Sequence, residues 1–407
     1  MIKKIPSDAL KVGMFIHDLN VDWMNHPFVR NQFAVADDNV IAQIMATGVR
    51  EVYIDTERGL DLADAPTVEE VNSELDAQLL KLAEEPPPII KVSFAEELTR
   101  ARKIHNQATN AVKTVMRDIR LGKAIELEGV AQVVEDITES VLRNSGALVG
   151  LGGIKDKDEY TFLHSVSVCT LLVTFAQSLG MDREMIRLAG TGGLLHDTGK
   201  MKVPNEILNK PGRLTDEEFA IMRTHPEEGW LILKDIPGME EIPLEITLHH
   251  HERIDGTGYP HKLPGDQISR MAQMAAVVDV YDAITSDRCY HKGMPAPEGL
   301  RKLWEWSKFH FNPELVQAFM RTVGIYPVGT LVKLESSRLG VVIEQNEASM
   351  LQPKVKVFFS LKSNTYIQPV LVDLARPMGK GGADKIVGHE NPEKWGINIS
   401  RFLGEQT

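Results

Sequence analysis

The chain has 407 residues, which is more than one hydrophobic core usually holds, so two or three domains are expected. Its 43% hydrophobic and 25% charged residues are typical of a soluble globular protein. The formal charge of −12 argues against duplex nucleic acid or an anionic membrane as partner, since both attract a basic surface. A small phosphorylated ligand remains compatible, because a local patch or metal ions can hold it.

Location is inferred from three features of the sequence. Only two cysteines occur, Cys169 and Cys289, in stretches typical of a core, which favours a reducing compartment. The first residues are basic but precede no apolar segment, unlike a signal peptide. No apolar run approaches the about 20 residues of a membrane span. We therefore expect a cytoplasmic protein without a membrane partner.

The N-terminal part, residues 1–65, predicts a small α/β domain with a regulatory role. Short apolar stretches at 14–16 and 52–54 indicate strands, and they flank a helical segment over 39–47. Residues 66–93 are acidic and then proline-rich, which is typical of a linker. No residue in this part has catalytic spacing.

Residues 94–150 predict a long helical connector. The segment is rich in helix formers, and Val112, Val115 and Ile119 recur at helical spacing. Such a stripe packs on a partner helix, on a second subunit or on the chain's own core. A homodimer through 94–150 and internal packing are therefore both open at this stage.

The remainder predicts a mainly α protein with a β appendage. Residues 151–325 show a succession of helices without strand alternation, so an all-α domain is expected; Asp182 is suited to cap its second helix. Residues 326–376 alternate polar and apolar side chains around polar turns, as in a small antiparallel sheet. Residues 377–407, rich in glycine and charge, read as a loosely docked tail.

Histidines are concentrated in the helical part. Seven of the 13 lie between His164 and His261. The adjacent pair His196-Asp197 suits a two-metal site, because an imidazole gives one lone pair to one metal whereas a carboxylate can bridge two. Bridging carboxylates hold divalent ions about 3.5–4 Å apart, the separation used in phosphoryl transfer. Such a pair alone means little, but further candidates lie on other predicted helices: His164, His225, His250, His251 and Asp279.

The local context of these residues fits a metal site. His196 and Asp197 come where a helix stops at Gly199, and glycines within 190–193 indicate close packing, since each costs about 0.5–1 kcal/mol in a helix. His250 and His251 would point roughly 100° apart on a regular helix. They can share one metal only if the helix ends there, and the glycine-rich turn just beyond supplies that end.

These motifs resemble a known family. The blocks His196-Asp197-Thr198-Gly199-Lys200 and His250-His251-Glu252-Arg253-Ile254-Asp255-Gly256-Thr257-Gly258-Tyr259-Pro260 look like the signature of the HD-GYP branch of the HD phosphohydrolases. The stretch from Asp279 to Arg288 is similar to the third family block. The resemblance covers about residues 150–320. The first 60 or so residues more weakly resemble a domain of unknown function that often precedes HD-GYP domains.

The resemblance implies an HD-type helical fold and hydrolysis of cyclic di-GMP to pGpG and onward to GMP. It implies two divalent transition metals, Fe or Mn, with a water or hydroxide between them as nucleophile. By position, Asp197 bridges the metals and Lys200 stabilises the phosphorane or protonates the leaving oxygen. Substrate phosphates would meet Lys200, Tyr259, Arg288 and Lys292. The metal ligands would be His164, His196, Asp197, His225, His250, His251 and Asp279.

Two positions depart from the family pattern. Some members carry a glutamate four residues before the first ligand histidine, where it helps to hold a third metal. Tyr160 occupies that position here, and Glu159 lies on another helical face, so we expect two metals. A basic residue often follows the last block's tyrosine, but His291 stands there, with Lys292 next.

Other interpretations remain open. The chain is alternatively a regulatory module that binds a dinucleotide or a signalling protein with little turnover, or an HD phosphohydrolase of another nucleotide. Several neighbouring residues are expected to play minor parts. His249, His261 and His310 are interpreted as spectators or surface histidines, Glu252 as a loop cap or an orienting group, and Asp282 as a helix cap or an outer carboxylate.

Overall fold

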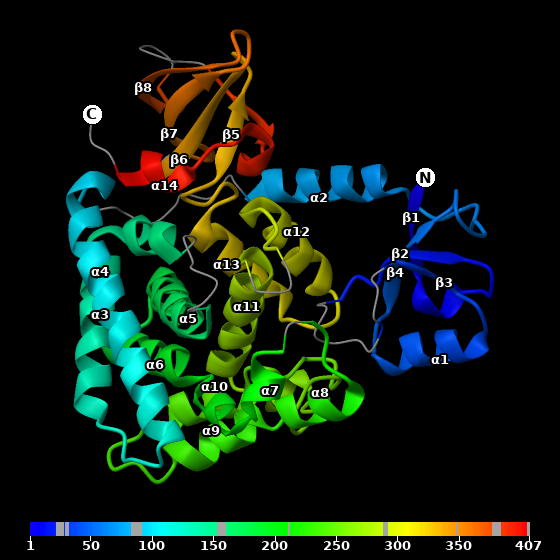
Figure 1. Ribbon diagram of the computed structural model, residues 1–407. Coiled ribbons are helices and arrows are strands. Elements are labelled where there is room, and N and C mark those ends of the chain that lie inside the picture. Colours follow the sequence, from blue (N-terminus) through cyan, green and yellow to red (C-terminus); the bar gives the residue numbers. More distant parts are fainter. Residues whose placement is uncertain are drawn as a thin grey trace. The chain divides into compact units, whose positions relative to one another are not determined.

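The computed structural model describes residues 1–21, 28, 32–82, 92–152, 160–210, 212–287, 292–346, 349–376 and 384–404. The chain forms two compact units (Figure 1). Unit 1 consists of Met1–Lys81 and Asn209–Ala220, and unit 2 of Leu82–Leu208 and Ile221–Thr407.

Unit 1 contains a four-stranded antiparallel sheet with the strand order β1-β4-β2-β3. Its elements are β1 (Ile2–Pro6), the 3-10 helix η1 (Ser7–Ala9), β2 (Phe15–Asp18), β3 (Phe33–Ala34), α1 (Asp38–Ala46), β4 (Glu51–Asp55) and α2 (Val68–Leu82). Asp37 caps α1 by accepting from the Val40 N–H at 3.0 Å. The predicted α/β character is confirmed. Strand β1 was missed because Lys3 and Lys4 interrupt its apolar pattern, and the predicted linker contains α2.

Unit 2 is built mainly from helices. They are α3 (Phe94–Arg120), α4 (Leu127–Gly152), α5 (Tyr160–Ser178), α6 (Arg183–Leu195), η4 (Thr198–Lys202), α7 (Asn205–Leu208), α9 (His225–Leu233), α10 (Glu241–His249), η5 (Gly265–Gln267), α11 (Arg270–Thr285), α12 (Ala296–Trp306) and α13 (Pro313–Val323). Helix α8 (Asp216–Met222) begins in the unit 1 segment. The described part of 151–325 contains no strand, only the isolated bridge Asp255–Pro264, so the all-α prediction is confirmed.

The apolar stripe of α3 is buried inside the chain. Val112, Met116 and Ile119 have little or no exposure, and α3 and α4 run side by side next to α5 (Figure 1). A partly buried ion pair joins the two helices: the buried Glu97 accepts from Arg143 Nε at 2.8 Å. Of the two open readings, internal packing therefore accounts for this stripe.

Helix α5 is the central helix of unit 2. Its segment Thr161–Ser178, with a mean hydropathy of 1.3, is long and apolar enough to cross a membrane by length and composition alone. However, 78% of that segment is buried within the protein. Its apolarity reflects contact with other helices on several sides, including α4, α6 and α11.

Helix α6 packs closely against its neighbours, as its glycines predicted. Asp182 caps it by accepting from Met185 N–H at 2.9 Å, which confirms the predicted cap. A Cβ at Gly192 would lie 2.5 Å from the Ile246 side chain of α10. A Cβ at Gly190 would lie 2.8 Å from both Val134 of α4 and a side chain of α5. Small residues therefore allow α6 to lie between three helices.

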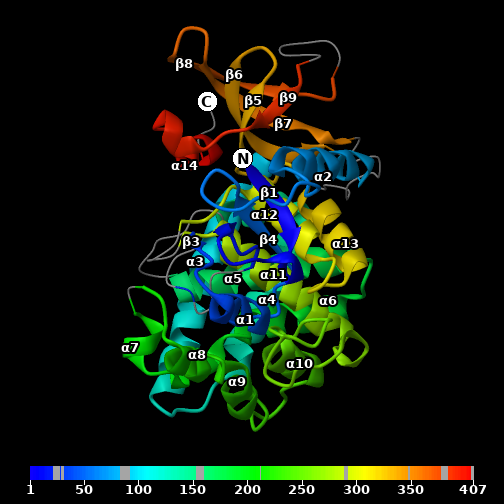
Figure 2. The ribbon, with the colours of Figure 1, turned by 90° about the vertical axis from the view of Figure 1, so that its right-hand side faces the viewer.

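The C-terminal region forms a five-stranded antiparallel sheet with the order β8-β7-β6-β5-β9 (Figure 2). The strands are β5 (Leu331–Leu334), β6 (Arg338–Asn346), β7 (Ser349–Ser360), β8 (Thr365–Asp373) and β9 (Ile386–His389), followed by η6 (Pro392–Trp395) and α14 (Ile399–Gly404). The β character of the appendage is confirmed. The prediction of a loose tail over 377–407 was wrong in part, because Ile386, Gly388 and His389 pair with β5.

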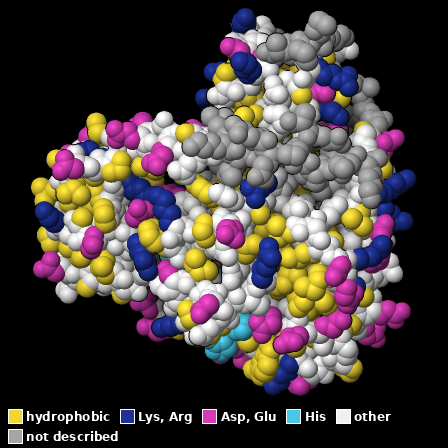
Figure 3. All heavy atoms as spheres, turned by 180° about the vertical axis from the view of Figure 1, so that it is seen from behind, with side chains coloured by type: hydrophobic (Ala, Val, Ile, Leu, Met, Phe, Trp, Pro, Cys, Tyr) yellow, Lys and Arg dark blue, Asp and Glu magenta, His cyan; other side chains and the backbone are white. Residues whose placement is uncertain are grey.

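On the face seen in Figure 3, lysine and arginine side chains are interspersed with aspartate and glutamate. This distribution accords with a chain of 45 basic and 57 acidic residues.

We predict that Gly199→Ala destabilises the protein strongly. A Cβ there would lie 1.9 Å from the His225 carbonyl oxygen and 2.4 Å from the Gly229 nitrogen, both backbone atoms that cannot rotate away. The expected loss is about 3 kcal/mol, the upper end of ordinary overpacking costs, measured by urea unfolding.

The matched control is Gly129→Ala on α4, where an added Cβ meets nothing within 4 Å. This change should be neutral or should stabilise by up to about 1 kcal/mol, because alanine favours helix. Equal unfolding midpoints for the two variants would contradict the tight contact at Gly199.

Candidate metal centre

Three helix termini bring the central residues together. Helix α6 ends at Leu195, so His196 and Asp197 occupy the turn between α6 and η4. The close approach at Gly199 places that turn against the start of α9, where His225 is the first residue. Helix α10 ends at His249 with His250 as its cap, so the helix ends where the sequence required it to end.

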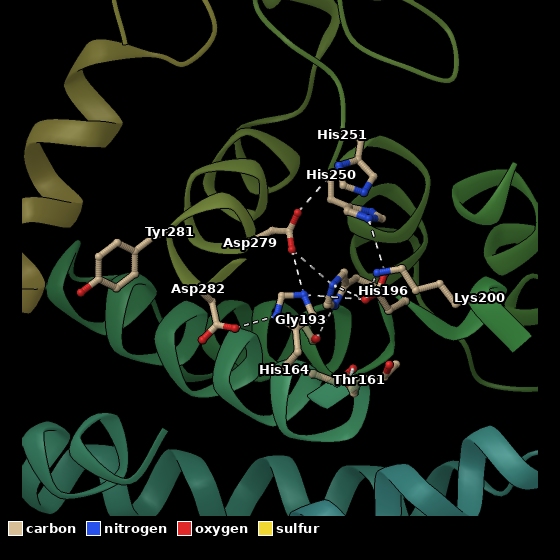
Figure 4. A network of polar contacts seen from close by, with 12 residues as sticks. Thr161, His164, Gly193, His196, Lys200, His250, His251, Asp279, Tyr281 and Asp282 are labelled. Atoms are coloured by element: carbon tan, nitrogen blue, oxygen red, sulfur yellow. Dashed lines mark hydrogen bonds and ion pairs between the residues drawn. The ribbon is translucent and has the colours of Figure 1, made fainter. Parts of the chain in front are cut away.

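The first group of side chains comes from α5, α6 and α11. His164, His196 and Asp279 each offer one donor atom within 4.8 Å of the other two, and all three are buried. His164 Nε2 lies 2.9 Å from Asp279 Oδ1, and His196 Nε2 lies 3.7 Å from the same oxygen (Figure 4). These atoms form a compact donor set for one cation.

The second group consists of His225, His250 and His251, whose donor atoms also lie within 4.8 Å of one another. The Nδ1 of His225 donates to the Met222 carbonyl at 2.8 Å, and that of His250 to the Thr247 carbonyl at 2.9 Å. Since a carbonyl can only accept, each Nε2 carries a lone pair. These two Nε2 atoms face each other at 3.3 Å. A bound cation would satisfy both.

Asp197 lies between the two groups, and each of its oxygens faces one of them. Oδ2 is 3.4 Å from His196 Nε2 and 3.7 Å from His164 Nε2. Oδ1 is 3.5 Å from His225 Nε2 and 4.0 Å from His250 Nε2. Lys200 Nζ contacts Oδ2 at 2.6 Å. The carboxylate is 1% exposed, so protein groups form its surroundings.

Burial and charge set the protonation states that metal binding needs. Burial lowers the pKa of His225 to about 4 and that of His250 to about 3, so both are neutral at pH 7. Burial alone would raise the pKa of Asp197, but the charges of His196 and Lys200 hold it well below its usual range. Neutral imidazoles and ionised carboxylates are the forms that bind divalent cations.

Two buried atoms in this cluster are unsatisfied in the described part of the chain. His196 Nε2 and Asp197 Oδ1 have no hydrogen-bond partner. A buried polar atom without a partner is costly, whereas one cation in each donor group would accept these lone pairs. The nitrogen and oxygen donors suit divalent transition metals, so the residues present fit the metal centre that the sequence predicted.

Asp282 contacts His164 on the side of the ring away from Asp279 and orients it. Its Oδ2 lies 2.6 Å from His164 Nδ1, on the opposite side of the ring from Asp279 (Figure 4). A carboxylate in this place favours the tautomer with the proton on Nδ1, whose Nε2 can coordinate a metal. Of the two interpretations of Asp282, the structure therefore supports a carboxylate that contacts a proposed metal ligand rather than a helix cap.

The loop after α10 is closed by Glu252. Its two oxygens accept from the His261 N–H at 2.6 Å and the Leu263 N–H at 3.0 Å, so the predicted loop cap is confirmed. Tyr259 of this loop is 8% exposed and stacks on His251, with ring centroids 4.6 Å apart. The guanidinium of Arg223 lies over the Tyr259 ring at 4.9 Å. The Tyr259 ring therefore supports His251.

The interpretation of His310 as a surface residue was wrong. His310 is 6% exposed, and its Nδ1 lies 3.3 Å from Asp255 Oδ2. Its carbonyl also accepts from the Ile254 N–H at 3.1 Å. The segment before α13 thus anchors the loop that carries Tyr259. His249 is likewise buried, with Nδ1 3.2 Å from Glu245 Oε2.

Some residues predicted for the site lie outside the described residues or away from the cluster. Arg288, Cys289, His291 and Glu159 lie outside the described residues, and so does the side chain of Tyr160. Lys292 forms an ion pair with Glu393 and is not part of the cluster. The sequence analysis did not predict that Arg223 lies at this cluster. Its position two residues before the proposed ligand His225 could have indicated it.

Comparisons with known proteins agree with this geometry. Residues 2–130 match a domain of unknown function (DUF3391), and residues 153–315 match the HD domain. The chain is 45% identical over 396 residues to the cyclic di-GMP phosphodiesterase PA4108 of Pseudomonas aeruginosa, covering 97% of this chain and 94% of that protein. The chain belongs to the HD-GYP family.

More distant relatives match part of this HD-GYP chain. The response regulator RpfG of Xanthomonas campestris, a cyclic di-GMP phosphodiesterase, is 36% identical over 168 residues, 41% of this chain and 44% of that protein. The 3'3'-cGAMP-specific phosphodiesterase 1 of Vibrio cholerae is 37% identical over 142 residues, 35% of this chain and 33% of that protein. HD-domain proteins depend on metals, and the histidine and aspartate groups described above are suited to hold them.

We predict a pH-dependent contribution of Asp255 to stability. Burial would raise its pKa, but contacts with His310 and Thr257 lower it to about 2. A carboxyl whose folded pKa is depressed contributes stability above its unfolded pKa of about 4 and loses it as the pH falls toward 2. Asp255→Asn should therefore lower the unfolding free energy at pH 7 by about 2 kcal/mol.

Urea unfolding between pH 3 and 7 measures the difference between Asp255→Asn and the unchanged protein, which should shrink below pH 4. The control is Asp266→Asn, because Asp266 is exposed nearby and such surface changes stay within about 0.5 kcal/mol. A difference independent of pH would rule out the ionised Asp255–His310 contact.

Proposed function

We propose that this HD-GYP chain is a metal-dependent phosphodiesterase that hydrolyses cyclic di-GMP to pGpG. The observation that carries the proposal is Asp197, whose two oxygens face two separate groups of buried ligands. The near full-length relative from Pseudomonas aeruginosa, named a cyclic di-GMP phosphodiesterase, supports the choice of substrate. Onward hydrolysis to GMP stays a prediction.

We assign two metal ions to this centre, with iron or manganese as the expected elements. One ion would be held by His164, His196 and Asp279 and the other by His225, His250 and His251, and Asp197 would serve both. The bound metals would supply Lewis acidity toward the phosphate and activate a water at neutral pH. The donor set of imidazole and carboxylate supports a transition metal rather than calcium or magnesium.

Two basic side chains near the cluster, Lys200 and Arg223, are suited to bind the negatively charged phosphates of the substrate. Lys200 is mostly buried and lies 2.6 Å from Asp197 Oδ2, next to the position where a phosphate would meet the metals. From there its ammonium stabilises developing charge and donates a proton to the leaving ribose oxygen. Arg223, held over the Tyr259 ring, offers a planar guanidinium for phosphate oxygens. The role of Arg288 stays a prediction.

A second substrate is favoured by one specific observation. The Vibrio cholerae relative named for 3'3'-cGAMP shares 37% identity with part of this chain, which supports testing other cyclic dinucleotides. A regulatory module without turnover is disfavoured, because the seven proposed metal ligands offer their donor atoms close together. A substrate panel therefore decides between dinucleotides.

The proposal is tested with protein purified without oxygen and loaded with Fe(II) or Mn(II). Chromatography of reactions with cyclic di-GMP, 3'3'-cGAMP and pGpG should show cyclic di-GMP converted fastest. In Asp197→Asn, one amide oxygen replaces two charged oxygens. Turnover should fall by more than the 10–100-fold that is typical of outer partners of metal ligands, and metal content should fall with it.

The control is Asp235→Asn, a change of the same chemistry at an exposed position, which should keep both activity and metal. Metal-loaded protein that leaves cyclic di-GMP intact, or Asp197→Asn with unchanged turnover, would overturn the proposal.

A further prediction separates two roles for Tyr259. If the ring positions His251 by stacking, Tyr259→Phe should keep metal content and KM close to those of the unchanged protein. Tyr259→Ala should then lower metal affinity by about 10–100-fold. If the hydroxyl instead binds a phosphate, Tyr259→Phe should raise KM while metal content stays constant. Mass spectrometry of bound metal and steady-state kinetics distinguish these results.

A cytoplasmic location, a homodimer through residues 94–150 and a signalling-protein partner also stay predictions. The two-cysteine composition supports the first. Because the apolar stripe of α3 is used within the chain, a homodimer would have to form through the outer faces of α3 and α4.

A further inference from the structure

Apart from the metal centre, unit 2 contains a cavity of about 440 Å³. None of the seven proposed metal ligands lines it. Its walls come from the ends of α4 and α11, the middle of α5, the start of α12 and the chain around β5 and β9. Its volume lies within the range of about 300–1,000 Å³ typical of small-molecule sites.

Two buried hydroxyls line this cavity without a partner. Ser167 Oγ of α5 and Thr330 Oγ1 before β5 have no hydrogen-bond partner in the described part of the chain, and their residues are 4% and 8% exposed. By contrast, Thr170 and Thr285 of the same wall donate to carbonyls of their own helices at 2.9 and 2.7 Å. Ser167 and Thr330 are therefore available to a ligand that donates and accepts hydrogen bonds.

The charge of the lining excludes anions. The charged residues are Asp282, Asp287, Glu390, Glu393, Lys292 and His389. Both cations are already engaged, Lys292 with Glu393 and His389 Nε2 with Glu298 at 2.9 Å. A phosphate here would face four carboxylates but only one lysine, which Glu393 already neutralises, so the substrate and its phosphorylated products do not suit this cavity.

The rest of the lining is aliphatic, with Leu148, Leu171, Val328, Leu331 and Leu403. A flat ring packs well on such a surface, its N–H groups suit carboxylate acceptors, and sugar hydroxyls suit Ser167 and Thr330. We propose that this cavity binds an uncharged, nucleoside-like molecule that lacks a phosphate.

The cavity also touches the metal centre through one residue. Asp282 lines the cavity and holds His164 Nδ1 at 2.6 Å. A ligand that changes the position of Asp282 changes the orientation of His164 and hence the geometry of one metal set. The cavity therefore acts as an effector site for the metal centre; this coupling rests on the proposed phosphodiesterase function.

Binding is tested by calorimetry on the metal-loaded full chain with guanosine and adenosine, and with 5′-GMP as the charged counterpart. At least one nucleoside should bind one per chain. Its Kd should rise about 5–10-fold in Ser167→Ala and in Thr330→Val, each of which removes one hydroxyl. The control is Thr138→Val on α4, also buried but outside the cavity, which should leave Kd unchanged.

Failure of both nucleosides to bind at millimolar concentration would overturn the site. So would an affinity that Ser167→Ala, Thr330→Val and Thr138→Val change equally, or 5′-GMP binding with the same dependence on Ser167 and Thr330. These results do not depend on activity, so they separate the site from the proposed function.

Coupling is tested by turnover of cyclic di-GMP with and without saturating nucleoside. The rate should change at least about two-fold in the unchanged protein, and Thr330→Val should need a higher nucleoside concentration for the same change. Binding without any change in rate would overturn the effector role.

Discussion

The buried charge of Asp197 is the constraint on which the rest of unit 2 depends. A carboxylate that is 1% exposed needs compensating groups on every side. Lys200 contacts one oxygen, and histidine side chains surround both. This arrangement leaves two groups of histidine nitrogens gathered around one carboxylate, where bound cations would offset the cost of burying it. Folding of these helices thus builds a site whose electrostatics favour divalent metals.

Several proposed metal ligands lie at helix ends rather than in the middle of helices. Neighbours on a regular helix point roughly 100° apart, so His196 with Asp197, and His250 with His251, require the helix to stop. Helices α6 and α10 end at these pairs, and Gly199 allows the turn after α6 to approach α9 within backbone contact distance. The glycines of α6 therefore serve the site through packing, and the Gly193 carbonyl also accepts from His196 Nδ1 at 2.8 Å.

The sequence predicted the parts of the site whose signal is local. His196-Asp197 and His250-His251 are adjacent residues at helix ends, and Asp282 follows Asp279 by one helical turn. The contact between Asp255 and His310 joins residues far apart in the chain, and no local pattern marks His310 as buried. Strand β1 was hidden for a different reason, since its lysines lie against carboxylates of the folded unit.

The carboxylates around the centre have the same charge but make different contacts. Asp282 orients His164, Glu252 closes the loop through two backbone N–H groups, and Asp255 ties that loop to His310. Each contact depends on the position of its carboxylate, so exchanging the three would not preserve the site. Of these three, Asp282 also lines the cavity, so α11 is one element that joins the metal centre to the C-terminal region. The appendage thereby gains a physical route to the chemistry.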